Sequence, residues 1–244
     1  MRSMLNSVDS NRGNGMNMEV PKLSAQDIER KSIEVLSKLN LGKILLAPQA
    51  TPIEDIVTTV SNKFGVEFEI KDLPQGVLGQ FSIQPYGIFI DSSIANTDRM
   101  PFTLAHEFGH FVLHRKVRMK QGEYVFSDLE RHLLTGKKKL KTKRDWIEYQ
   151  ANRFASAILM PKRTIRQAVM NLQRELGIVH ELGTIHLDHQ PCNQRDAQLI
   201  ISELTGIYRV NRTNVFYRLS DLGILKDHTL DSTGHISEFF LCLQ

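Results

Sequence analysis

Apolar residues recur at helical spacing in the first part of the chain. From Ser24 to Leu39 they fall every three or four positions, and the hydroxyl of Ser24 can act as the N-cap of this helix. A second helix is expected from Thr51, with Pro52 in its first turn and Gly65 at its end. Both patterns predict helices that place one face against a core.

After the second helix the period of the pattern changes to two. Val66, Phe68 and Ile70 alternate with glutamates, which predicts a half-buried strand. Residues 77–83 and 87–91 predict two more strands, joined around a Gln-Pro-Tyr sequence. This region is therefore expected to form a small sheet.

Helical spacing returns after residue 100. The predicted helices span residues 102–114, 146–161, 164–176, 195–204 and 211–222. Residues 115–144 are polar and basic, and residues 181–194 are rich in His, Asp and Gly, so both segments are expected to be loops. The second of these loops is expected to link two parts of the chain.

The pattern divides the chain into five parts. They are a disordered lead at 1–22, a main domain at 23–180, a linker at 181–194, a helix-turn-helix-like segment at 195–226 and a tail at 227–244. Within the lead, Met16 or Met18 is an alternative start of the protein.

Composition narrows the class of protein. The chain has 244 residues, 41% of them hydrophobic and 24% charged, which is typical of a globular protein with a sizeable core. Its net charge of +4 is compatible with an acidic or nucleic-acid partner. Two cysteines imply no disulfide framework, and no apolar run reaches the length of a membrane span. The first 20 residues are polar and without the apolar centre of a secretion signal, so none is expected there. A cytoplasmic location is expected.

The helix at 102–114 carries the main chemical signal. His106 and His110 are four residues apart, which places both imidazoles on one face of a helix, one turn apart. Two such rings can bind one zinc ion, and Glu107 between them can accept a proton from a zinc-bound water. Apolar neighbours predict that this helix is buried, and buried histidines are costly unless they are paired or coordinated. Histidines satisfied within the core are the alternative.

The helix at 146–161 supplies the third expected ligand. Glu148 shares a helix face with Ala151, Asn152 and Ala155, so it points toward a neighbouring helix that small residues allow to come close. A carboxylate in such a contact needs a cation, and zinc with two histidines and one glutamate keeps a fourth position open. Asn152, one turn later, is expected to hold a ligand histidine by its second ring nitrogen, with an ordinary helix hydrogen bond as the alternative.

The strands near this site raise a question about substrate. In many zinc peptidases a strand beside the metal pairs with extended substrate through backbone hydrogen bonds. Either strand, 77–83 or 87–91, could do so here, or the two could form a structural hairpin. His114 lies one turn beyond His110, too far along the axis to join the same ion easily, and is interpreted as structural.

Three further segments each allow two interpretations. His186, His189 and Cys192 have the spacing of a second metal site, but no fourth ligand is evident and a loop is expected. The basic run at 137–144 predicts a solvated loop, or contact with an acidic partner or nucleic acid.

The C-terminal helices are the third ambiguous segment. Residues 195–204 and 211–222 resemble a DNA-binding helix-turn-helix, to which Arg209, Arg212 and Arg218 add charge. The alternative is that they serve packing or substrate docking.

Two motifs together resemble the ImmA/IrrE-type zinc metallopeptidases. They are the stretch from Phe102 to His114 and the stretch Glu148-x-Gln150-Ala151-Asn152-Arg153-Phe154-Ala155 running to Leu159-Met160-Pro161. Residues 208–225 also look like that family's helical segment after the catalytic core. The resemblance covers about residues 25–225.

The resemblance implies a fold, a cofactor and an activity. The fold would be α+β, a zincin-like (thermolysin-like) domain with a small antiparallel sheet, followed by a helix-turn-helix-like segment. The cofactor would be Zn²⁺, with His106, His110 and Glu148 as ligands and Glu107 as general base. The substrate would be a DNA-binding, Xre-like repressor whose cleavage releases stress-response or mobile-element genes.

One residue departs from the family pattern. The family often has a second glutamate where Gln150 stands, which leaves Glu148 as the only carboxylate of this motif. The competing interpretation of the chain is a regulator with structural zinc that binds a repressor or DNA through its C-terminal helices without cutting. Structural zinc sites usually have four protein ligands, and the three expected here argue against it.

Overall fold

The computed structural model describes residues 22–116, 125–129, 142–179 and 181–229. Almost all of the predicted lead, residues 137–141 of the basic run and most of the predicted tail lie outside these ranges. The longer helices are α1 (Ala25–Lys38), α2 (Ile53–Phe64), α3 (Met100–His114), α4 (Lys143–Leu159), α5 (Lys162–Glu175), α6 (Pro191–Tyr208) and α7 (Arg212–Asp221). The strands are β1 (Glu67–Lys71), β2 (Val77–Ile83), β3 (Tyr86–Asp91), β4 (Val125–Leu129), β5 (Ile185–Leu187) and β6 (Leu225–Asp227).

Local signals set several helix ends as predicted. Ser24 caps α1 in a capping box with Asp27, and Asn211 caps α7 by accepting from the backbone N–H of Asn214. Gly65 ends α2 in the left-handed conformation, with a φ of 65°. α4 begins at Lys143, earlier than predicted, because Thr142 and Asp145 form a second capping box. Lys143 of the basic run therefore lies on a helix.

The main sheet is mixed, so the expectation of an antiparallel sheet is wrong. Its strand order is β1-β3-β2-β4, with β1 parallel to β3 and the other two pairs antiparallel. The β2–β3 hairpin places β3 between β1 and β2, and β3 then runs in the direction of β1. The alternation of apolar residues marks a strand but does not specify its direction. At the sheet's outer edge Ile70 is 43% exposed, contrary to its predicted burial.

The sheet topology also corrects the expectation about substrate pairing. β2 is hydrogen-bonded to β3 and β4, and β3 to β1 and β2. Neither strand therefore has a free edge for an extended peptide. Within the described part of the sheet, β1 and β4 are the outer strands.

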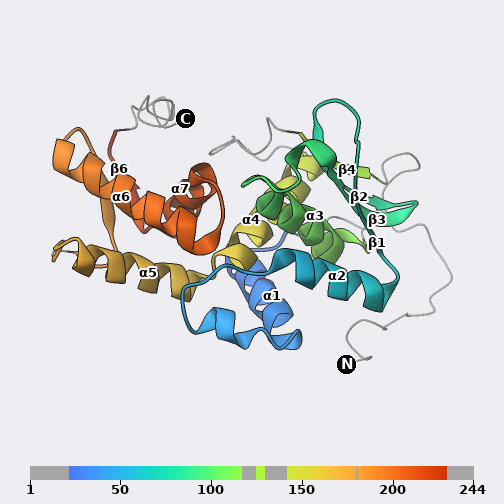
Figure 1. Ribbon diagram of the computed structural model, residues 1–244, viewed down its shortest axis with the longest axis horizontal. Helices are drawn as coiled ribbons and strands as arrows, with labels where there is room; N and C mark the ends of the chain where they lie inside the picture. The colour runs from blue at the N-terminus through green and yellow to red at the C-terminus, as the bar shows by residue number, and fades with distance from the viewer. Residues whose placement is uncertain (1–21, 117–124, 130–141, 180, 230–244) are drawn as a thin grey trace.

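Helices α3 and α4 pack on each other at the centre of the molecule. Figure 1 shows them between the sheet and the helices α5 to α7, with α1 and α2 alongside. Gly109 of α3 faces α4 so closely that a Cβ atom there would lie 3.2 Å from Phe154 Cδ1 and 3.3 Å from the Ala151 carbonyl oxygen. The small residues predicted to allow close helix approach do so.

The C-terminal part contains more regular structure than predicted. The segment expected to be a linker at 181–194 contains β5 and the first turn of α6, and the expected tail begins inside β6. β5 pairs in parallel with β6 from Ile185–Leu225 to Leu187–Asp227. A three-residue strand is too short to show a period, and its partner is distant in sequence, so the pattern did not reveal it.

A single core joins the two predicted parts. Buried apolar residues of α5, α6 and α7 belong to the same cluster as those of α1 to α4. Arg218 of α7, expected to add charge for DNA contact, is 1% exposed. It donates to the Met160 carbonyl oxygen at 2.9 Å and forms an ion pair with Glu29 of α1. That expectation is wrong for Arg218, because its charge is satisfied inside the protein.

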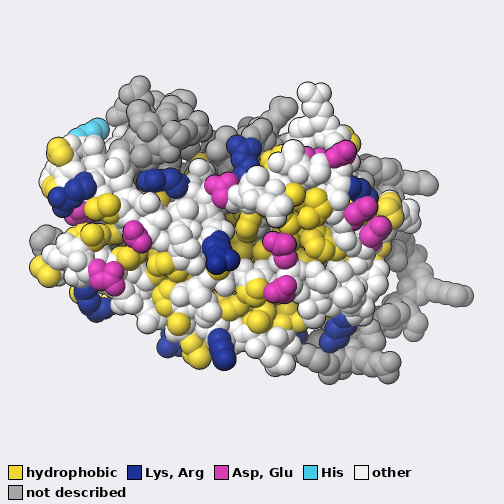
Figure 2. All heavy atoms as spheres, viewed as in Figure 1, with side chains coloured by type: hydrophobic (Ala, Val, Ile, Leu, Met, Phe, Trp, Pro, Cys, Tyr) yellow, Lys and Arg dark blue, Asp and Glu magenta, His cyan; other side chains and the backbone are white. Residues whose placement is uncertain are grey.

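The surface visible in Figure 2 carries acidic and basic side chains interspersed with hydrophobic ones. In the four described ranges, every helix is too short or too polar to cross a membrane.

Candidate metal centre

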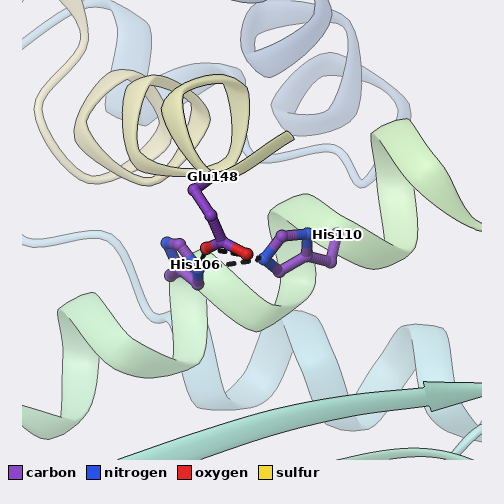
Figure 3. A group of neighbouring side chains, drawn as sticks. All are labelled: His106, His110 and Glu148. Atoms are coloured by element: carbon purple, nitrogen blue, oxygen red, sulfur yellow. Dashed lines mark hydrogen bonds and ion pairs between the residues drawn. The ribbon is translucent and has the colours of Figure 1, made fainter. Parts of the chain in front are cut away.

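Three donor side chains meet between α3 and α4. His106 and His110 point from consecutive turns of α3 toward Glu148, which reaches across from α4 (Figure 3). The two Nε2 atoms lie 2.9 Å apart, and Glu148 Oε2 lies 3.3 Å from His106 Nε2 and 3.6 Å from His110 Nε2. The structure thus brings together the three residues predicted from two separate segments.

These distances fit a single small cation. A zinc ion with bonds of about 2.0–2.1 Å holds tetrahedral ligand atoms about 3.3 Å from one another. The three separations between the donor atoms of His106, His110 and Glu148 lie close to this value. Two imidazoles and one carboxylate are also a donor set that zinc accepts, so the residues fit the metal.

Burial makes this grouping costly without a cation. His106 and His110 are 0% and 1% exposed, and Glu148 is 9% exposed. Burial lowers the pKa of His110 to about 4, so this imidazole is neutral at pH 7 and can donate a lone pair. Burial raises the pKa of Glu148, but the adjacent His110 and His106 outweigh it and hold that pKa below its ordinary value. The centre therefore presents a carboxylate anion and a neutral imidazole to a bound cation.

Asn152 contacts the ring of His106 as predicted. Its Oδ1 lies 2.8 Å from His106 Nδ1, the nitrogen on the far side of the ring from the donor cluster. An amide oxygen only accepts, so His106 Nδ1 carries the proton and Nε2 is left with its lone pair facing Glu148. This contact orients the first histidine.

The second histidine contacts His114, which in turn contacts Gln150, and sequence reasoning did not place either residue at the site. His110 Nδ1 lies 3.0 Å from His114 Nδ1, and His114 Nε2 lies 3.2 Å from Gln150 Oε1. His114 and Gln150 are both fully buried. The contact between His110 and His114 could have been inferred from the sequence, because the two residues are four positions apart on one helix. The contact between His114 and Gln150 could not, because it depends on how α3 and α4 pack.

Glu107, next to His106 on α3, lies against strand β2 of the sheet. It is fully buried, and a Cβ atom at Gly79 of β2 would lie 2.9 Å from its Oε1 atom. The same Cβ atom would lie 2.6 Å from Thr103 Cγ2. Gly79 therefore provides the space that the Glu107 carboxylate occupies. No local sequence signal indicated this role, since it depends on how β2 crosses α3.

The other candidate residues do not assemble a comparable centre. His186 lies on β5 and contacts Glu181 at 2.6 Å, while Cys192 is exposed on α6 and contacts Gln190. Within the described ranges, the group of His106, His110 and Glu148 is the one set of three or more such side chains with converging donor atoms. A second metal site at 186–192 is therefore not supported, although the alternative of a plain loop is also wrong.

Two histidines on one helix, with a glutamate between them and a carboxylate from a neighbouring helix, are an arrangement found in metallopeptidases. The family Peptidase_M78, described as an IrrE N-terminal-like domain, matches residues 61–184, about half of the chain. The chain belongs to this family, and the resemblance to ImmA/IrrE-type metallopeptidases is confirmed. No curated protein matches the chain.

Proposed function

We propose that the protein is a zinc-dependent endopeptidase. The observation that carries the proposal is the convergence of His106, His110 and Glu148 on one point, with Glu107 next to them on α3. Three protein donors leave a fourth tetrahedral position open, as catalytic zinc sites do. The same three residues are also the best candidates for the metal ligands.

Zinc bound there would supply a Lewis acid that polarises the scissile carbonyl and acidifies a coordinated water. Glu107 accepts the proton of the attacking water and passes it to the leaving amine. Gly79 keeps the space above Glu107 open so that its carboxylate stays in position. Asn152 holds His106 in the tautomer that leaves Nε2 unprotonated.

The proposed substrate is a DNA-binding, Xre-like repressor whose cleavage releases stress-response or mobile-element genes. Support comes from the family, whose description names the IrrE type. Such a substrate places the enzyme in the cytoplasm.

Separating metal binding from proton transfer tests the proposal. Glu107→Gln is expected to keep zinc and to lower cleavage at least about 100-fold, because general-base catalysis contributes about 10²–10⁴-fold. His106→Ala is expected to lose both zinc and cleavage. The measurement is zinc content together with fragment formation from an Xre-like repressor, with and without a chelator. Cleavage by Glu107→Gln at the wild-type rate would show that another group is the base.

The same assay separates the enzyme from a regulator that binds without cutting. Fragments that disappear with chelator identify an enzyme, whereas a stable complex with intact repressor identifies a binding protein. Arg218 is unavailable for a DNA contact because it is buried against Glu29, and much of α7 is also buried. Arg209 is exposed and remains available for such a contact.

A further inference from the structure

His110 has a different environment from its partner His106. The far nitrogen of His106 meets an amide oxygen directly, in Asn152 at 2.8 Å. The far nitrogen of His110 meets another imidazole, His114, at 3.0 Å, and that imidazole meets the amide of Gln150 at 3.2 Å. Asn152 and Gln150 both lie on α4, the helix that also carries Glu148.

The direction of these hydrogen bonds follows from the proposed function, on which this step rests. If His110 Nε2 faces the metal with its lone pair, its proton must be on Nδ1. His110 Nδ1 then donates to His114 Nδ1, which must be unprotonated. The remaining proton of His114 is on Nε2, where it donates to Gln150 Oε1. In this series of hydrogen bonds every donor N–H therefore faces an atom that can accept.

We propose that His114 and Gln150 are positioning residues that together fix the tautomer and orientation of His110. Gln150 accepts from His114, which prevents the His114 ring from presenting an N–H to His110. The pair extends across the same helix contact that brings Glu148 to the histidines. α4 therefore contributes a ligand and, through Asn152 and Gln150, the terminal acceptor for each ligand histidine.

The burial of both residues supports this role over simple space filling. His114 and Gln150 are each fully buried, and a buried polar side chain is costly unless its hydrogen bonds are satisfied. Apolar residues of similar size would fill the same volume without that cost. The hydrogen bonds to His110 and between the pair account for polar residues at these two positions.

Zinc affinity of variants tests the proposal. His114→Phe removes the acceptor and keeps a ring, and it is expected to raise the zinc Kd about 10- to 100-fold, as loss of such outer contacts typically does. Gln150→Met is expected to weaken zinc binding less than His114→Phe does. Gln150→Glu is expected to bind zinc as the wild type does, since a carboxylate also accepts from His114 Nε2. Ile158→Ala, at a fully buried position farther along α4, is the matched control and should lower stability without changing the zinc Kd.

A second measurement uses the full-length zinc-loaded wild type. Long-range ¹H–¹⁵N NMR spectra should show His110 protonated at Nδ1 and His114 protonated at Nε2. The proposal is overturned if His114 is protonated at Nδ1, or if Gln150→Met binds zinc as tightly as the wild type; the second result decides even if His114→Phe does not fold. A wild type that binds no zinc at all would instead refute the proposed function, and the positioning role would fall with it.

Discussion

At the residue scale, the site depends on the absence of a Cβ atom at Gly79. Gly79 lies on β2 directly above Glu107, where a methyl group would lie 2.9 Å from the carboxylate Oε1. That separation is shorter than van der Waals contact allows, and Thr103 Cγ2 on the other side is closer still, at 2.6 Å. A side chain added at position 79 therefore requires Thr103, Glu107 or the β2 backbone to shift.

We predict that Gly79→Ala retains zinc but cleaves about 10- to 100-fold more slowly, because a displacement of about 1 Å from the productive position can cost a factor of that order. Steady-state kinetics and zinc content of the same preparation check this. Gly42→Ala is the control, because a Cβ atom there would have nothing within 4 Å. Wild-type turnover in Gly79→Ala would contradict the prediction that a methyl group at this position displaces the Glu107 carboxylate.

At the element scale, the contact between α3 and α4 determines whether the three donors meet. Gly109 lies at this contact, between the two histidines in sequence and against Ala151 of the partner helix. The helix that supplies Glu148 can approach this closely because both positions are small. The distance between Glu148 and the imidazoles is therefore a property of the helix pair.

We predict that Gly109→Val lowers the free energy of unfolding by about 1–3 kcal/mol, as overpacking a core contact does, and weakens zinc binding. Urea unfolding of the metal-free protein and a chelator competition for zinc are the measurements. Gly206→Ala on α6, where a Cβ atom meets nothing within 4 Å, is the control and should gain up to about 1 kcal/mol from helix propensity. Unchanged zinc affinity in Gly109→Val would show that zinc binding does not depend on the close spacing of α3 and α4.

The helices and the three donors could be predicted from the sequence because their signals are local. Residues at i and i+4 share a helix face wherever the helix lies, and caps such as Ser24 and Gly65 act on their own turn. Strand direction, the β5–β6 pair and the roles of Gly79, Gln150 and Arg218 depend on partners far away in sequence. The spacing of residues along the chain does not indicate which distant residues will be in contact.

At the scale of the whole molecule, the buried imidazoles link stability to pH. Burial lowers the pKa of His110 to about 4 and the pKa of His114 to about 3, below the ordinary value of 6.5. Below pH 6.5 the unfolded chain therefore binds more protons than the folded one, and the free energy of unfolding falls as pH falls. Glu148, whose pKa is also lowered, acts in the same direction once pH drops below its ordinary value of 4.5.

We predict that the urea midpoint of the metal-free protein is highest above pH 6.5 and declines steadily toward pH 4. His114→Phe removes one of the two imidazoles whose pKa burial lowers, and it should make the decline shallower. Unfolding followed by circular dichroism at several pH values checks both. Stability that is constant or increases between pH 6.5 and pH 4 would show that these histidines are not buried as neutral groups.

The central claim is that His106, His110 and Glu148 bind one zinc ion together. The most direct test is a crystal structure of the zinc-loaded protein with anomalous diffraction recorded on both sides of the zinc absorption edge. The account predicts one strong anomalous peak, about 2.0–2.2 Å from His106 Nε2, His110 Nε2 and a carboxylate oxygen of Glu148. A zinc peak elsewhere, or a peak at the two histidines with the Glu148 carboxylate turned away from it, would contradict the account.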